Sequence, residues 1–120
     1  MQQPFREKLS LQKRKELSAK ITATHTSRVP IIVERSQDSP NLPLLDKKKF
    51  LAPQHYTMAN FVAEIMNHLP SHEQSSLSFY VGNGTRAMPA MLIQQVYDQY
   101  KDIDGFLYVT YGEHKAFGGF

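Results

Sequence analysis

The chain of 120 residues is long enough for one domain with a single hydrophobic core and too short for two. It has no cysteine, which excludes disulfides and a cysteine nucleophile, and no apolar run approaches the roughly 20 residues of a membrane-spanning helix. The net charge of +3 is uneven, because residues 1–20 carry six basic and two acidic side chains. The basic character therefore belongs to this segment.

Helical periodicity begins the chain. Phe5 and Leu9, then Leu17 and Ile21, recur at a spacing of four residues with charged residues between them. This pattern predicts helix over residues 4–24, and the threonines and serine that follow indicate a loop.

Two strands are predicted next. RVPIIVER (28–35) is a β-branched run whose apolar side chains point both ways, so both of its faces should be covered. Residues 36–46 contain two prolines and several turn formers, which predicts a surface loop. KKKFLAP (47–53) predicts a short strand, and Pro53 suits its end or a sheet edge because proline cannot donate to a ladder.

Helices and strands alternate in the rest of the chain. TMANFVAEIMNHLP (57–70) predicts a helix that Thr57 caps and a proline ends. SLSFYVGNG (76–84) predicts a strand that ends in a turn, and PAMLIQQVYDQY (89–100) predicts a second amphipathic helix. GFLYVTYG (105–112) predicts a last strand that is apolar on both faces.

This order predicts an α+β fold, with two N-terminal helices followed by β-β-α-β-α-β. A last strand that returns to the middle of the sheet makes it a β-grasp arrangement with a four-stranded mixed sheet. We expect three parts in the chain: an N-terminal helical extension at 1–24 packed on the domain, a core at 25–111 and a tail at 112–120. Glycines 112, 118 and 119 leave few side chains to anchor the tail, which should be mobile.

Motifs for catalysis, cofactors and metals are not found. The sequence has no HExxH motif, Walker loop or nucleophile elbow, and Gly82-Asn83-Gly84 fits a hairpin turn better than a phosphate cradle. A helix-breaking proline separates His68 from His72 and Glu73, so we interpret them as polar residues at a helix end and not as metal ligands. The sequence predicts neither an enzyme nor a cofactor.

Basic residues gather in the N-terminal helices and before the second strand. Phe5 is the one aromatic residue among the helices, so base stacking has no support and nucleic acid is not an expected partner. The helices present either a solvated face or a surface for an acidic protein or lipid. Lys47, Lys48 and Lys49 either protect a sheet edge or attract an acidic peptide that adds a strand, and both interpretations stay open.

Five strings together resemble a known family. RVPIIVER, LDKKKFLAP, TMANFVAEI, FYVGN and FLYVTYGEHKAFG are similar to strings of the GABARAP family of ubiquitin-like autophagy modifiers, also called the autophagy-related protein eight family. The match runs from Phe5 to Gly118 and is weakest in the loop at 36–45. The resemblance implies a ubiquitin-like β-grasp fold and a role in autophagosome formation and cargo selection.

The resemblance also gives a meaning to the tail YGEHKAFGGF. In this family a cysteine protease cuts after a glycine that follows an aromatic residue, and activating and conjugating enzymes then join this glycine to phosphatidylethanolamine. Phe117 and Gly118 match that pair, so cleavage at Gly118–Gly119 is expected, with Gly119–Phe120 as the alternative. The resemblance implies a cytoplasmic protein that lies on the autophagosomal membrane after lipidation.

A peptide-binding site for cargo receptors is implied as well. These receptors carry an aromatic-x-x-aliphatic motif that pairs with the second strand. The positions that match the aromatic-receiving pocket are Leu17, Ile21, Pro30, Lys49, Leu51 and Phe106. Those that match the aliphatic-receiving pocket are Phe50, Ala52, Pro53, Tyr56, Phe61 and Ile65. Arg28 matches a basic residue beside the strand, and Lys47 is expected to attract acidic residues that flank the motif.

Two departures from the family pattern bear on ligand choice. Leu17 stands where many relatives carry an acidic residue, and Glu64 replaces an aliphatic residue, so ligand preference is expected to differ from that of familiar members. The alternative function is a non-conjugated adaptor of the same fold. Such an adaptor would bind peptides or the cytoskeleton, including microtubules, through its basic helices.

Overall fold

The computed structural model describes residues 3–70, 77–82, 84–86 and 88–113. Its strands are β1 (Arg28–Arg35), β2 (Lys49–Pro53), β3 (Leu77–Val81), β4 (Thr85–Arg86) and β5 (Leu107–Glu113). Its helices are α1 (Phe5–Lys8), α2 (Leu11–Thr24), α3 (Met58–Met66) and α4 (Ile93–Tyr100). No helix in these described ranges has both the length and the apolar character needed to cross a membrane.

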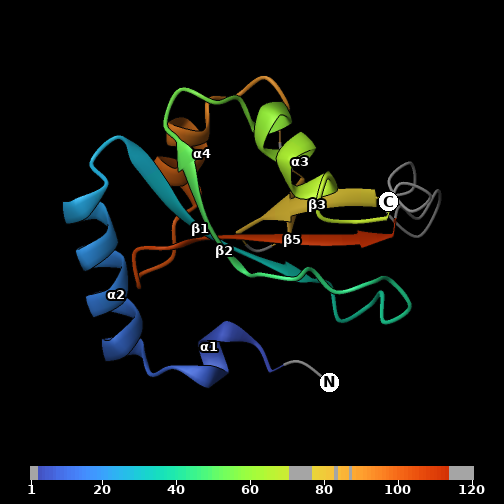
Figure 1. Ribbon diagram of the computed structural model, residues 1–120, viewed down its shortest axis with the longest axis horizontal. Coiled ribbons are helices and arrows are strands. Elements are labelled where there is room, and N and C mark those ends of the chain that lie inside the picture. Colours follow the sequence, from blue (N-terminus) through green and yellow to red (C-terminus); the bar gives the residue numbers. More distant parts are fainter. Residues whose placement is uncertain (1–2, 71–76, 83, 87, 114–120) are drawn as a thin grey trace.

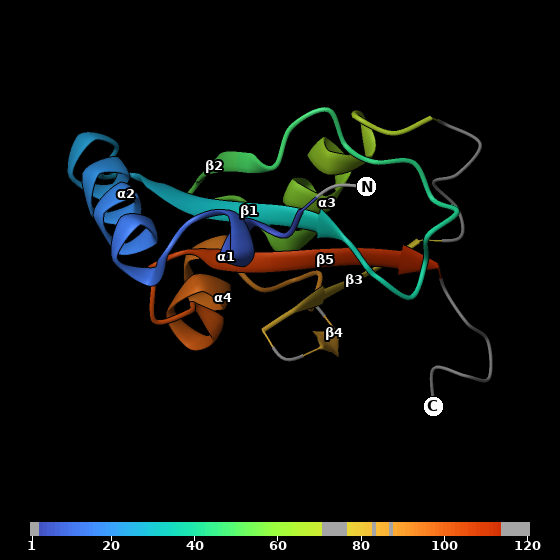
Figure 2. The same cartoon turned by 90° about the horizontal axis from the view of Figure 1, so that it is seen from below.

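The strands form one mixed sheet in the order β2-β1-β5-β3-β4, with β2 at one edge (Figure 2). β1 is antiparallel to β2 and parallel to β5, and β5 is antiparallel to β3. The last long strand therefore lies in the middle of the sheet, which confirms the β-grasp arrangement.

Within the described residues the sheet has five strands and not the four expected. After β3 the chain turns back, and Thr85 and Arg86 pair with Val81 and Tyr80. Gly82 and Gly84 flank this turn with φ values of 58° and 95°, which glycine adopts without the clash of a Cβ atom. The hairpin interpretation of this segment is therefore confirmed, and its second strand is too short to stand out in the sequence.

Helices cover both faces of the sheet, with α3 and α4 on one side and α1 and α2 on the other (Figure 1). The main core lies on the α3–α4 side and includes Ile31, Val33, Phe61, Ile65, Val96, Leu107, Val109 and Tyr111. A second cluster consists of Phe5, Ile32, Phe106 and Tyr108, with Leu9, Leu17 and Ile21 packed against it. Consecutive residues of β1 thus enter different clusters, which confirms that both of its faces are covered.

The N-terminal helical segment consists of two helices, as the expected order has it, and the break between them lies at Leu9 and Ser10. Leu9 has extended backbone angles, with φ −124° and ψ 143°. Ser10 then begins α2 as its N-cap, because its side-chain oxygen accepts a hydrogen bond from the N–H of Lys13. The break lets Phe5 of α1 and Leu17 of α2 both reach the second cluster.

α3 begins as expected and ends earlier than expected. Thr57 accepts a hydrogen bond from the N–H of Asn60, whose side chain accepts one from the N–H of Thr57, which forms a capping box. After Met66 the chain tightens, since the N–H groups of His68 and Leu69 each donate to the carbonyl three residues earlier.

α4 begins four residues later than expected because tertiary contacts hold the preceding segment in a loop. The carbonyls of Pro89 and Met91 accept hydrogen bonds from the N–H groups of Ala59 and Met58 at the start of α3. The N–H of Ile93 donates to the carbonyl of Tyr56 at 2.7 Å. These bonds direct backbone groups of 89–93 toward α3 instead of into a helix.

β5 continues beyond its expected end. Gly112 is buried in this strand opposite Ser78, and Glu113 lies opposite Leu77. The expected start of a mobile tail at Gly112 is therefore wrong, because the ladder with β3 holds residues 112 and 113. Phe117, Gly118 and both candidate cleavage bonds lie outside the described residues.

Gly105 lies where α2 packs directly against the chain before β5. It has a φ of 90°, and a Cβ added to it would overlap the hydroxyl of Ser18. We expect Gly105→Ala to lower the free energy of unfolding by about 2–4 kcal/mol, from backbone strain and overpacking together. Urea denaturation of the full chain measures this loss.

Gly84→Ala is the matched control for that substitution. Gly84 has a φ of 95°, and nothing lies within 4 Å of a Cβ added there. Gly84→Ala should lower the free energy of unfolding by about 1 kcal/mol, since it introduces backbone strain without overpacking. Equal losses in the two variants would contradict the close packing of α2 on Gly105.

Candidate functional site

The outer side of β2 is free of any sheet neighbour within the described part of the chain and can pair with an extended peptide. The N–H of Val33 donates to the carbonyl of Lys48 at 2.9 Å, and antiparallel pairing alternates along the strand. The backbone groups of Lys49 and Leu51 therefore point away from β1. Arg28 reaches this edge, where its guanidinium donates to the carbonyl of Leu51 at 3.3 Å.

The residues predicted to receive the aromatic side chain gather on the α2 side of β2. Leu17 and Ile21 pack against the cluster that contains Phe106. Leu51 lies opposite Pro30 in the register, on the face that Ile32 also occupies. Pro30 and Phe106 are buried, Leu17, Ile21 and Leu51 are half-buried, and Lys49 is exposed. The structure thus brings this whole predicted set to one face, where Pro30 and Phe106 are buried and the other members remain partly or fully accessible.

The residues predicted to receive the aliphatic side chain lie mostly on the opposite, α3 side. Phe50, Ala52, Phe61 and Ile65 are buried in the main core, and the half-buried Tyr56 packs against it. Pro53 departs from this set. It lies opposite Arg28 in the register and, by alternation, on the same face as Leu51.

Two accessible residues of this second face were not predicted as site residues. Val62 and Met66 of α3 are half-buried and pack against the main core beside Phe61 and Ile65. Their place in the apolar stripe of the helix was the available signal, because Val62 and Met66 are four residues apart and share a face. Glu64, also on α3, is half-exposed.

The arrangement of the two faces suits a motif with two anchors separated by three positions. Side chains alternate along a strand, so residues three apart point to opposite sides of a sheet. A peptide added along β2 with the pattern aromatic-x-x-aliphatic can therefore direct its aromatic residue toward α2 and its aliphatic residue toward α3.

The three lysines before and in β2 have different surroundings. The ammonium of Lys48 lies 3.0 Å from a carboxylate oxygen of Glu34 and donates to the carbonyl of Gln3 at 2.7 Å. The hydrogen bond to Gln3 connects the start of β2 to the N-terminal segment. The ammonium of Lys47 lies 4.5 Å from the ring centroid of Phe50, and Lys49 is exposed on the strand. Lys47 and Lys49 are therefore better placed than Lys48 to meet acidic residues of a ligand.

His68 has a structural partner at the end of α3. Its Nδ1 lies 3.1 Å from a carboxylate oxygen of Asp46, and its ring packs edge-on against Phe50 with centroids 5.5 Å apart. His72 and Glu73 lie outside the described residues. Within the described ranges, no group of three metal-ligating side chains comes together.

A buried ionic network lies behind the α2 face, and sequence reasoning missed it. The fully buried carboxylate of Asp104 accepts hydrogen bonds from Arg14 at 2.8 Å and from the hydroxyl of Tyr108 at 2.6 Å. Burial, and then the hydrogen bond to Asp104, raises the pKa of Tyr108 well above its usual value, so the phenol stays protonated and donates. Ninety positions separate Arg14 from Asp104, so no local pattern in the sequence pairs them.

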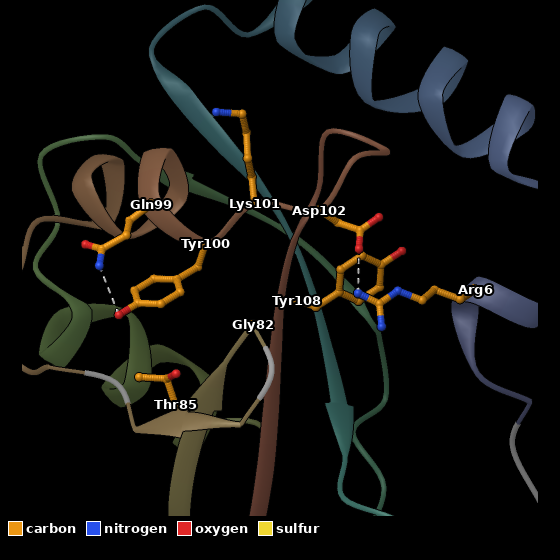
Figure 3. A pocket seen from close by; sticks show the side chains of 8 residues that line it. All are labelled: Arg6, Gly82, Thr85, Gln99, Tyr100, Lys101, Asp102 and Tyr108. Carbon is orange, nitrogen blue, oxygen red and sulfur yellow. Dashed lines mark hydrogen bonds and ion pairs between the residues drawn. The ribbon is translucent and has the colours of Figure 1, made fainter.

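Two surface cavities lie elsewhere on the described part of the molecule, and the second reaches Lys48, directly before β2. One, of about 280 Å³, opens between α1, the end of α4 and the β3–β4 turn. There Arg6 lies over the ring of Tyr108, 4.0 Å from its centroid, and pairs with Asp102 at 2.7 Å (Figure 3). The other, of about 740 Å³, lies between α1, the end of β1 and the loop that follows it. Lys48 lines the second cavity, but neither cavity is lined by a residue that matches the aromatic-receiving or the aliphatic-receiving pocket.

Comparisons with known proteins agree with the fold and the resemblance. Residues 13–118 match the family described as "Autophagy protein Atg8 ubiquitin like". An autophagy-related protein 8-like protein of Dictyostelium discoideum is 40% identical over 117 residues, which cover 95% of this chain and 92% of that protein. Human microtubule-associated protein 1 light chain 3 gamma is 36% identical over 115 residues, 96% of this chain and 78% of that protein.

A solved structure gives the same assignment. The crystal structure of Trypanosoma brucei ATG8 matches with a TM-score of 0.84 and 31% identity, over 98% of this chain and 100% of that one. The predicted family and the ubiquitin-like α+β fold are therefore confirmed. The chain belongs to the Atg8 family of ubiquitin-like autophagy proteins.

Proposed function

We propose that this chain is a ubiquitin-like modifier that is conjugated through Gly118 to phosphatidylethanolamine and acts in autophagosome formation. Its family membership supports this role, as does the aromatic–glycine pair Phe117-Gly118. The chain has no cysteine, so a processing protease and the activating and conjugating enzymes must supply the thiols. In this proposal the chain is their substrate and not an enzyme. It moves from the cytoplasm to the autophagosomal membrane when it is lipidated.

On the membrane, the modifier would select cargo receptors by β-strand addition along β2. The observation that carries this proposal is the edge strand itself. The backbone groups of Lys49 and Leu51 point outward, between apolar clusters on the two faces of the sheet. A receptor segment with an aromatic-x-x-aliphatic core would bond to the strand and place one anchor on each face. Acidic residues beside the core would meet Lys47 and Lys49.

A non-conjugated adaptor that binds the cytoskeleton is the alternative function. Lys8, Lys13, Lys15 and Lys20 are exposed on or beside α1 and α2, and this basic surface could meet an acidic protein such as a microtubule. The name of the human relative associates that relative with microtubules. An adaptor of this kind needs no cut after Gly118.

Processing of the tail tests the modifier proposal directly. Incubation of the full chain with its cognate cysteine protease should remove Gly119 and Phe120, because glycine lets the backbone enter a narrow groove. Intact-mass spectrometry should then show the loss of one glycine and one phenylalanine residue. Loss of phenylalanine alone would move the modified glycine to position 119. A chain that stays uncut would contradict conjugation.

A further inference from the structure

The segment between α4 and β5 (residues 101–106) joins the N-terminal helices to the sheet through buried polar contacts. Asp104 is at its centre, and its side chain has no exposed surface. One carboxylate oxygen accepts from Arg14 at 2.8 Å and from Tyr108 at 2.6 Å, and the other accepts from the N–H of Phe106 at 2.8 Å. A charge buried this deeply is stable only when such partners surround it.

α2 also packs directly against this segment. The hydroxyl of Ser18 donates to the carbonyl of Asp104, and the neighbouring Gly105 leaves room for Ser18 because it has no Cβ atom. The hydroxyl of Tyr97 donates to the carbonyl of Gly105 at 2.6 Å, which anchors the same segment to α4. Asp104 therefore lies at a junction of α2, α4 and β5.

This junction lies directly behind the aromatic-receiving face. Arg14 and Ser18 are on the side of α2 that faces Asp104, and Leu17 and Ile21 follow them at helical spacing. The buried Phe106 of that face donates its backbone N–H to the same carboxylate at 2.8 Å. One carboxylate thus contacts both α2, through Arg14, and Phe106, whereas most residues of the aliphatic-receiving face belong to a different cluster.

We propose that Asp104 is a positioning residue for the aromatic-receiving pocket, which sets the distance between α2 and Phe106. It touches no ligand and acts through Arg14, Tyr108 and Phe106. The inference rests on the proposed peptide-binding function and adds a specific consequence to it. Disturbing Asp104 weakens the aromatic anchor of a ligand and leaves the aliphatic anchor unchanged.

The test is a double-mutant cycle between the protein and its ligand. Asp104→Asn keeps the shape of the side chain but turns an acceptor into an amide donor that faces the donors Arg14 and Tyr108. Three acidic-flanked synthetic peptides are titrated calorimetrically into wild type and variant: one with a tryptophan-x-x-leucine core, one with alanine for tryptophan and one with alanine for leucine. In Asp104→Asn, the factor by which affinity falls when tryptophan is replaced by alanine should be at least about fivefold smaller than in wild type. The factor by which affinity falls when leucine is replaced should not change.

Asp98→Asn is the matched control, on the neighbouring helix α4. Asp98 is exposed and accepts a hydrogen bond from the side chain of Gln94 at 2.9 Å, so its replacement should leave the affinity lost on removing tryptophan or leucine as in wild type. Tyr108→Phe is the milder second variant, because it removes one hydroxyl donor to Asp104 and keeps the ring. It should reproduce the selective effect at smaller size if Asp104→Asn folds poorly.

The outcomes separate this inference from the proposed function. If wild type binds none of the peptides, strand addition along β2 is wrong. If wild type binds, and the contributions of tryptophan and leucine to affinity fall equally in Asp104→Asn, the carboxylate is merely structural. The positioning role is then overturned. Hydrogen exchange adds a second readout, since amides of α2 should exchange faster in Asp104→Asn than in Asp98→Asn. Equal exchange in the two variants would also overturn it.

Discussion

Replacing Gly118 by alanine should abolish membrane association of this protein in cells. The proposed conjugation joins the carboxyl group of Gly118 to a lipid amine after a protease and two thiol enzymes have handled the same residue. The active sites of these three enzymes must each admit a residue without a side chain, and the methyl group of alanine obstructs all of them. The lipid-conjugated fraction, read as a mobility shift and as membrane-associated puncta, should fall to background.

Gly119→Ala is the matched control, since it adds the same methyl group one position later. If the bond after Gly118 is cut, residue 119 is discarded, and this variant should still be conjugated. Conjugation lost only in Gly119→Ala would assign the modified terminus to Gly119. Membrane association that survives Gly118→Ala would favour the non-conjugated adaptor.

Reversing the charge of Lys49 should weaken binding of an acidic-flanked peptide about tenfold, or about 1.4 kcal/mol. Wild type should bind such a peptide with micromolar affinity, about −8 kcal/mol, as is usual for a short added strand. Lys49 is exposed on the edge strand, so Lys49→Glu replaces an attraction with a repulsion beside the ligand. Isothermal titration calorimetry at low salt measures the change.

A change of ionic strength and a charge reversal at a distant lysine are the controls for this experiment. Raising the ionic strength should weaken wild-type binding more than binding to Lys49→Glu, because mobile ions screen charges over about 10 Å at 0.1 M. Lys101→Glu changes the net charge equally, but Lys101 is exposed beyond the end of α4, away from β2. It should leave the affinity unchanged. Unaltered affinity in Lys49→Glu would remove the strand-addition site from β2.

Local sequence patterns were sufficient to predict the elements whose conformation depends on residues close together in the sequence. RVPIIVER has the bounds of β1, because β-branched residues on both faces suit a strand buried on both sides. Thr57 caps α3 through a bond to a residue three positions away. The hairpin after β3 follows from glycines that adopt positive φ. The motif strings, by resemblance, also predict the pocket residues, whose role in binding stays a prediction.

Other features depend on residues that are distant in the sequence. Residues 89–92 have helical periodicity, yet hydrogen bonds to the start of α3 keep them in a loop. Gly112 resembles the start of a loose tail, yet pairing with β3 buries it. Pro53 is adjacent in sequence to the aliphatic-receiving residues, but the register with Arg28 places it on the other face.

The sequence by itself determined the family and the order of all elements except the short β4, because these follow from local composition and from short strings. The tertiary structure alone decided that the two predicted sets of pocket residues lie mostly on opposite faces of the sheet. It also decided that Arg14 meets Asp104, since burial of a carboxylate requires partners that only folding brings together. Periodicity indicates which side of an element is apolar, whereas the fold determines what that side contacts.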